Sequence, residues 1–312
     1  MSAQYDALLK QETTAEALTA TCDFLTERLR LFLRRQEKVL VCFPDEGAAS
    51  LGGIFSEAIR NCGGVPVFWG PDYRWKELLR LAFDIHAHTV IAHPLVVLGL
   101  MKLAKYTATP LYIYNVVLCG YPYARWMVEG IKRGLDCRIW GCYSVASSPV
   151  IVGFTCPCQA GIHVRHDLFD AVVLDEQGDP VPDPGRGRLY LISKKNPFLV
   201  FDPHETSILL HQPCSCGCDS PRIVETLDAG ISNPAQAMIE KQILAWFSIL
   251  DLRARRTSHG TDLELVVFPG EQLPPLPSCA RLAIRPWQPE RDVPFAVQDH
   301  FMKMPEKFTT ES

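Results

Sequence analysis

The chain has 312 residues, of which 47% are hydrophobic and 21% charged, and its formal net charge is −4. That length fits one large or two medium domains, and the hydrophobic content is sufficient for a sizeable core. Proteins that bind nucleic acids or anionic membranes need clustered basic residues, and this sequence shows no such cluster. Neither partner is therefore expected.

The apolar runs, the N-terminal residues and the cysteines indicate in which cellular compartment the protein is expected. The longest apolar stretch, 88–101, is too short to span a bilayer and is predicted to be a buried strand followed by a helix. The N-terminal residues lack a basic start and an apolar signal core, which predicts a cytoplasmic protein. Twelve cysteines in such a chain are expected to be reduced thiols or metal ligands rather than disulfides.

The first half of the chain alternates between extended and helical patterns. Apolar residues at helical spacing predict helices at 15–35, 51–62, 74–85, 94–105 and 122–135. Continuous apolar runs between them predict strands at 38–43, 65–70, 88–93, 110–119 and 136–143. This alternation predicts an α/β fold with an open, mainly parallel sheet covered by helices.

The pattern changes after Ser147. Short apolar runs separated by Gly, Pro and Asp predict strands at 150–154, 171–176, 187–192, 197–201 and 207–212. A helix at 233–249 and strands at 251–257 and 262–268 follow, and the tail after Val293 is predicted to be polar and mobile. We therefore expect an α/β sheet subdomain at 1–147, a β-rich lobe at 148–227, barrel-like or a distorted antiparallel sheet, and a reduced C-terminal α+β lobe with its tail at 228–312.

Two short segments gather residues that bind metal ions. Zinc takes four sulfur or nitrogen ligands, and structural sites usually take close pairs from two separate turns. A Cys-x-Cys pair in a tight turn can place both sulfurs on one ion, and the alternative is that some of these are ordinary buried thiols. The residues themselves leave open which four bind, the candidates being Cys156, Cys158, His163 and His166 from one segment and Cys214, Cys216 and Cys218 from the other.

Several segments together resemble one protein family. They are FSEAIRNCGGVPVFWG (55–70), YNVVLCGYPYARWMVEGIKRGLDCRIWGCY (114–143), GIHVRHDLFDAVVLDEQGDPVPDPGRGRLYLIS (161–193) and QPCSCGCDSPRI (212–223). In order along the chain, from about 15 to about 268, they are similar to phenylacetate–CoA ligases and coenzyme F390 synthetases. That branch of the adenylate-forming superfamily activates a carboxylic acid with ATP and transfers the acyl group to coenzyme A.

The resemblance has consequences for the metal. Members of the branch carry a zinc held by a Cys, a following His and a later Cys-x-Cys, which implies Cys156, His163, Cys214 and Cys216 as ligands here. A site with all four positions filled by protein leaves none open for water, so the implied Zn²⁺ is structural.

The chain departs from the family pattern where ATP chemistry takes place. We find no Ser/Thr/Gly-rich phosphate loop and no lysine in a glycine-flanked loop near the end. The magnesium-binding acid of the family falls at Ser144, and the ribose-binding aspartate falls near Glu205 or has moved to Asp202. Together these departures predict that ATP and Mg²⁺ are not bound and that adenylation is lost or impaired.

Candidates for chemistry remain at the ends of the predicted strands, where open α/β sheets bind ligands. Cys142 is a candidate nucleophile and His93 a candidate catalytic base, with a buried thiol and a strand-end histidine as the respective alternatives. Tyr121, Tyr143, Ser144 and Glu205 are candidate substrate-binding residues, although the Tyr121 ring could instead fill the nucleotide slot.

These expectations lead to a functional hypothesis. The chain is predicted to be a divergent acyl- or aryl-CoA ligase-like protein of specialised metabolism, acting on a small carboxylic, activated acyl or carrier-bound substrate. The alternatives are a non-catalytic partner of a complete ligase or carrier protein, and a chain completed by a separate polypeptide. The resemblance also implies a homodimer.

Overall fold

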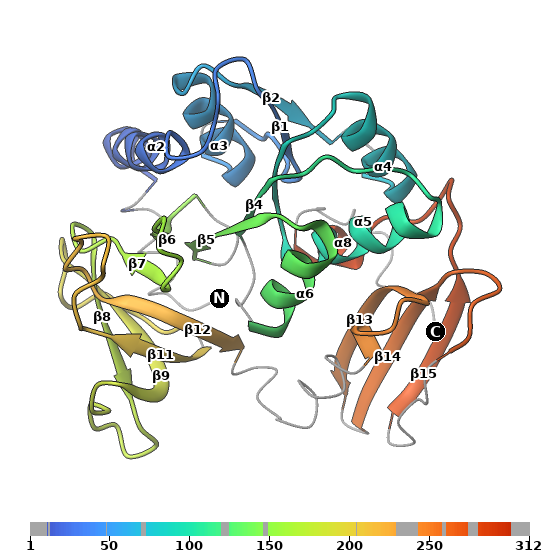
Figure 1. Cartoon of the computed structure of the whole chain (residues 1–312). Helices are drawn as coiled ribbons and strands as arrows, with labels where there is room; N and C mark the ends of the chain where they lie inside the picture. Colours follow the sequence, from blue (N-terminus) through green and yellow to red (C-terminus); the bar gives the residue numbers. More distant parts are fainter. Residues whose placement is uncertain are drawn as a thin grey trace.

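In the computed structural model, the described residues are 11, 13–47, 49–69, 73–119, 125–145, 149–203, 205–228, 243–257, 260–273 and 280–300. Five parallel strands form one half of the main sheet in the order β2-β1-β3-β4-β5. Figure 1 labels β1, β2, β4 and β5 of this half. Their bounds are Lys38–Val41 (β1), Val65–Phe68 (β2), Thr89–Ala92 (β3), Asn115–Cys119 (β4) and Arg138–Ser144 (β5). The predicted α/β fold with a mainly parallel sheet is confirmed.

Helices cover both faces of this half, as the continuous apolar runs of its strands require. They are α2 (Ala15–Leu29), α3 (Leu51–Asn61), α4 (Trp75–Asp84), α5 (Pro94–Tyr106) and α6 (Arg125–Leu135). Successive strand residues point to opposite faces, so Val39 and Val41 join the core under α2 and α3, whereas Leu40 joins the core under α4, α5 and α6. Helix α2 ends at Leu29, six residues before the predicted end, and a turn leads from there to β1.

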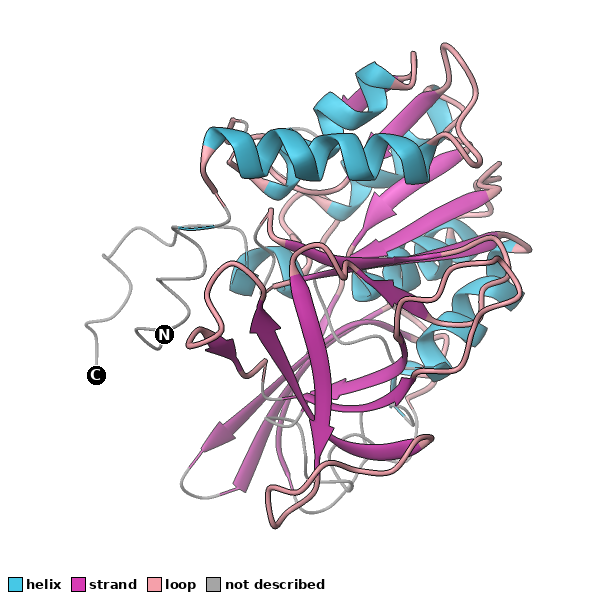
Figure 2. Ribbon diagram, turned by 90° about the vertical axis from the view of Figure 1, so that its left-hand side faces the viewer, coloured by secondary structure: helices cyan, strands magenta, loops and turns pink. Residues whose placement is uncertain are grey.

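The second half of the sheet is antiparallel and continues directly from β5. Its strands follow in the order β6-β7-β12-β11-β9-β10, with β8 paired to β9, which completes a 12-stranded sheet. Their bounds are Ile151–Thr155 (β6), Ile162–Val164 (β7), Phe169–Leu174 (β8), Gly185–Ser193 (β9), Val200–Phe201 (β10), Glu205–Leu210 (β11) and Arg222–Asp228 (β12). In Figure 2 the helices gather at one end of the molecule and strands without helical cover at the other.

Strands β7 and β12 are absent from the sequence-based expectation. The first has only three residues, and the second, RIVETLD, has neither a long apolar run nor a regular alternation. They pair with each other and join β6 to β11. Because β6 also pairs with β5, strands on both sides of residue 147 belong to one sheet. The subdomain boundaries themselves stay a prediction.

A smaller three-stranded sheet holds the C-terminal part. It consists of β13 (Ile249–Thr257), β14 (Gly260–Val267) and β15 (Ala280–Pro286), followed by helix α8 (Phe295–His300). The expected tail does not begin at Val293, because the Phe295 and Val297 side chains are buried in the core under α4 and α5.

The helix predicted at 233–249 lies mostly outside the described residues. Among the described helices, none combines the length and apolar character needed to cross a membrane.

Candidate metal centre

Cys156 and His163 lie on either side of a tight turn between β6 and β7. The turn is closed by the Gln159 N–H, which donates to the Cys156 carbonyl at 2.9 Å. The Gln159 side chain donates to the Ile139 carbonyl at 2.9 Å and so anchors the turn to β5. Gly161 has φ +110°, a conformation that strains any other residue, and a Cβ there would lie 3.0 Å from the Ile223 carbonyl oxygen of β12.

Cys214 and Cys216 lie in a second tight turn, before β12. The Gly217 N–H donates to the Cys214 carbonyl at 2.9 Å, and Gly217 takes the left-handed conformation with φ +83°. Strand pairing sets the two turns beside each other, since His163 pairs with Phe154 of β6 on one side and with Arg222 of β12 on the other. The register of three strands therefore brings together residues far apart in the sequence.

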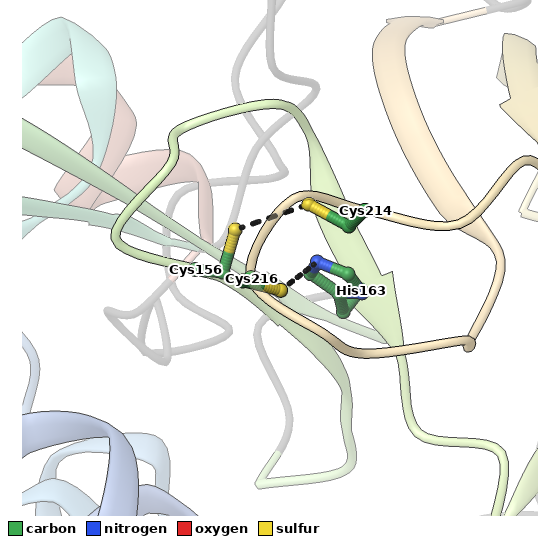
Figure 3. Close-up of side chains that lie close together, drawn as sticks. All are labelled: Cys156, His163, Cys214 and Cys216. Carbon is green, nitrogen blue, oxygen red and sulfur yellow. Dashed lines mark hydrogen bonds between the residues drawn. The ribbon is translucent and has the colours of Figure 1, made fainter.

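The four side chains converge on one point (Figure 3). The Sγ atoms of Cys156 and Cys214 are 3.7 Å apart, Cys216 Sγ lies 3.4 Å from His163 Nε2, and the four ligand atoms all lie within 4.8 Å of one another. A tetrahedral zinc with bonds of about 2.3 Å to sulfur and about 2.0 Å to nitrogen has edges of about 3.8 Å and about 3.5 Å. The donor set and its spacing thus fit a zinc ion.

Ser220 fixes the orientation of the histidine. Its Oγ lies 3.1 Å from His163 Nδ1, which leaves Nε2 directed at the sulfurs. The same hydroxyl lies 3.1 Å from Cys218 Sγ, so the Cys218 thiol contacts Ser220. Of the other sequence candidates, Cys158 and His166 are exposed. The structure therefore brings together Cys156, His163, Cys214 and Cys216, and leaves Cys158, His166 and Cys218 outside this group.

The surrounding charge also suits a metal. Burial lowers the pKa of His163, which favours the neutral imidazole that binds metals. The Cys216 backbone N–H is the largest cause of the lowered pKa of Cys214, and the Arg222 guanidinium adds to it. Burial raises the pKa of Cys156 to about 11. Zinc binds the thiolate form of cysteine, so coordination would have to offset the raised pKa of Cys156.

Arg222 connects the two turns. Its guanidinium donates to the Ala160 carbonyl at 2.9 Å and to the Gln212 carbonyl at 3.0 Å. Its Nε is buried without a hydrogen-bond partner among the described residues. Three thiolates and one Zn²⁺ leave one net negative charge, which a buried guanidinium would balance.

The candidate catalytic residues lie elsewhere, at the carboxyl ends of β3 and β5. Cys142 is 2% exposed, and burial raises the pKa of its thiol well above the usual range, which disfavours a nucleophilic thiolate. His93 is completely buried at the start of α5, where its Nδ1 accepts a hydrogen bond from the Leu95 N–H at 3.2 Å. Both observations favour structural roles, and catalytic roles for these residues stay predictions.

The candidate substrate-binding residues share no single site among the described residues. Tyr143 and Ser144 are buried in β5, and the Cys119 thiol donates to Ser144 Oγ at 3.5 Å. Tyr121 and the side chain of Glu205 lie outside the described residues. Their substrate-binding roles stay predictions.

Two residues beside the candidate metal ligands, Ser220 and Arg222, were not predicted from the sequence. The run SPRI directly after the cysteines was the available signal, but nothing in a local pattern tells which side chain faces the histidine.

No family model and no curated protein sequence matches the chain. Among solved structures, 2-hydroxyisobutyryl-CoA ligase in an open conformation with 2-HIB-AMP and CoA has a TM-score of 0.58 at 13% identity, over 80% of this chain and 59% of that one. A benzoate CoA ligase from Burkholderia xenovorans LB400 has a TM-score of 0.57 at 12% identity, over 90% of this chain and 65% of that one.

The amide bond synthetase McbA from Marinactinospora thermotolerans has a TM-score of 0.53 at 12% identity, over 90% of this chain and 65% of that one. The chain has the fold of adenylate-forming ligases. It spans less than two thirds of the length of each of these three proteins. The expected superfamily fold is confirmed, whereas the phenylacetate–CoA ligase branch stays a prediction.

Proposed function

We propose that this protein is a divergent member of the acyl- and aryl-CoA ligase group that acts on an activated acyl substrate, with ATP-dependent adenylation lost or impaired. The observation that carries the proposal is a ligase fold in which the described residues at the carboxyl ends of β3, β4 and β5 are buried and include no carboxylate. The substrate would be a small acyl group on coenzyme A or on a carrier protein. A role in specialised metabolism and a homodimer belong to the same proposal.

The strand ends are where an open α/β sheet places its ligand. In this sheet β3, β4 and β5 end near His93, Cys119 and Ser144, all of them buried and none of them an acid. Adenylation requires magnesium, held by acidic groups, to neutralise the polyphosphate charge. Ser144 stands where the resemblance places the magnesium-binding acid, which supports impaired adenylation.

The Cys/His cluster supports the phenylacetate–CoA ligase branch in particular. We propose that Cys156, His163, Cys214 and Cys216 hold one structural Zn²⁺ that joins the β6–β7 turn to the turn before β12. The expected result is about one zinc per chain, measured by mass spectrometry of metals in purified protein. Replacing Cys214 with serine should abolish the zinc, whereas replacing exposed Cys158 with serine should leave it. Full zinc content in Cys214→Ser would contradict the assignment.

Two assays test the enzymatic proposal. Exchange of labelled pyrophosphate into ATP, with benzoate and short-chain carboxylates as substrates, should stay at background. Transfer of the acyl group from benzoyl-CoA to pantetheine, in which the pantetheine thiol attacks the thioester and coenzyme A leaves, should exceed the uncatalysed rate. Carboxylate-dependent pyrophosphate exchange would contradict the loss of adenylation.

A non-catalytic partner of a complete ligase or of a carrier protein is the second candidate. The observation that favours it is the burial of Cys142 and His93, which leaves neither candidate catalytic side chain open to a substrate. Background activity in both assays, together with co-purification with a ligase or carrier encoded next to it, would favour this alternative.

A further inference from the structure

A cavity of about 600 Å³ lies away from the metal centre, beside the last turns of α5 and α6. Helix α5 begins after the carboxyl end of β3 and ends before β4, and α6 ends before β5. Because β4 and β5 begin after these helix ends, the cavity lies at the amino edge of the parallel sheet. His93, Cys119 and Ser144 lie at the opposite, carboxyl edge, so the cavity is separate from the site where the fold places a substrate.

Most of the lining is apolar. The apolar side chains in the lining include Met101, Leu111, Leu135 and Phe247, and its cationic side chains are Lys102 and Lys105. No carboxylate is among the described lining residues. Small-molecule sites commonly enclose about 300–1,000 Å³ with apolar walls and a few polar groups that orient the ligand, and this cavity matches both features.

The two lysines differ in environment. Lys102 is 6% exposed, and its Nζ donates to the carbonyls of Leu244 and Ile249, each at 2.7 Å. Burial lowers the pKa of Lys102 to about 7, so its charge is only partial at neutral pH. These contacts give Lys102 a structural role, in which it ties α5 to the chain entering β13.

Lys105 is the cation available to a ligand. It is exposed one turn further along α5, and its Nζ lies 5.1 Å from the centre of the Phe247 ring. The ring and the ammonium group thus stand together on the cavity wall, a pairing that orients the cation without neutralising it. A positive charge beside an apolar cavity is complementary to a ligand with one negative charge and an apolar body.

We propose that this cavity binds an amphipathic carboxylate, with its aryl or medium-chain acyl body between Met101, Leu111 and Leu135 and its carboxylate at Lys105. The described lining contains two cations, and Lys102 already donates to two backbone carbonyls. Lys105 can balance one negative charge, so a monoanion is favoured over a phosphate dianion. The site does not depend on whether the protein adenylates or transfers acyl groups.

Calorimetric titration with sodium octanoate tests the proposal, with 1-octanol and octyl phosphate as comparison ligands. Octanoate should bind at least tenfold more tightly than either. Lys105→Met should weaken octanoate at least tenfold without affecting 1-octanol, and Ala245→Trp, which fills the exposed rim of the cavity, should abolish binding of both. Lys132→Met, on α6 but not lining the cavity, should bind octanoate like the native protein.

The native protein offers an independent measurement. Octanoate should protect the Lys105 amine, but not that of Lys132, from acetylation by an N-hydroxysuccinimide ester, as read by peptide mass spectrometry. The absence of both octanoate binding and protection would overturn the site. Equal binding of 1-octanol would overturn the role of Lys105, and tighter binding of octyl phosphate would overturn the choice of a carboxylate.

Discussion

The Ser220 hydroxyl lies between His163 Nδ1 and Cys218 Sγ, each at 3.1 Å. A hydrogen bond on the far nitrogen of a metal-binding histidine fixes both the tautomer and the ring orientation. We therefore expect Ser220→Ala to lower zinc affinity by about tenfold or more. Competition with a chromophoric chelator measures this, and exposed Ser215→Ala on the same turn is the control. Equal affinities in the two variants would show that Ser220 has no orienting role.

Asp251 shows how burial shapes a pH response at a single residue. Its carboxylate accepts hydrogen bonds from the N–H groups of Leu252 at 2.9 Å and Phe295 at 2.7 Å. Burial nevertheless raises its pKa from 3.8 to about 7. Between these values the folded state binds more protons than the unfolded state, so the free energy of unfolding falls as pH rises from about 4 to about 7.

Asp251→Asn should remove this pH dependence. Because asparagine does not titrate, the free energy of unfolding of the variant should fall less than that of the native protein between pH 5 and pH 7, by about 2 kcal/mol. The variant should also be less stable at pH 5, because one acceptor oxygen is lost. Urea unfolding at the two pH values measures both effects. Parallel changes in the two proteins would argue against a raised pKa for Asp251.

At the scale of elements, the short helix α8 contributes to the core. Phe295 is 2% exposed, and the Arg253 guanidinium lies 4.2 Å from the centre of its ring. Phe295→Ala should therefore lower the free energy of unfolding by about 3–5 kcal/mol, as large-to-small changes of buried aromatic residues do. Chemical denaturation measures the change. Phe198→Ala is the matched control, because Phe198 is 92% exposed and its removal should have little effect.

The elements around the metal centre differ in how well local patterns predict them. Strands β1, β2, β3 and β5 and helices α3 to α6 were expected close to their observed positions, whereas β4 begins five residues after its predicted start. Each of these elements carries its own local signal, an apolar run in a strand or apolar residues at helical spacing in a helix. Strands β7 and β12 were not expected, since their stability comes from pairing with each other and with β6 and β11 rather than from a local pattern. These two strands set the position of His163.

At the scale of the whole molecule, the sheet has two halves with different support. The parallel half is covered by helices on both faces, whereas the metal centre lies where β6, β7 and β12 meet in the antiparallel half. Removing zinc with a chelator should accordingly raise amide hydrogen exchange at 151–164 and 214–223 while β1, β3 and β4 stay protected. Exchange measured by mass spectrometry tests this, and an unchanged pattern would argue against a structural metal.

The sequence by itself determined the alternating α/β architecture and the two segments that supply the candidate metal ligands. Both depend on local information, namely the spacing of apolar residues and of cysteines and histidines. The tertiary structure alone decided that Ser220 and Arg222 lie beside the candidate metal centre, that Lys102 donates to two carbonyls, and that a cavity opens beside Lys105. These features depend on strand register and on contacts between distant segments, which no local pattern in the chain encodes.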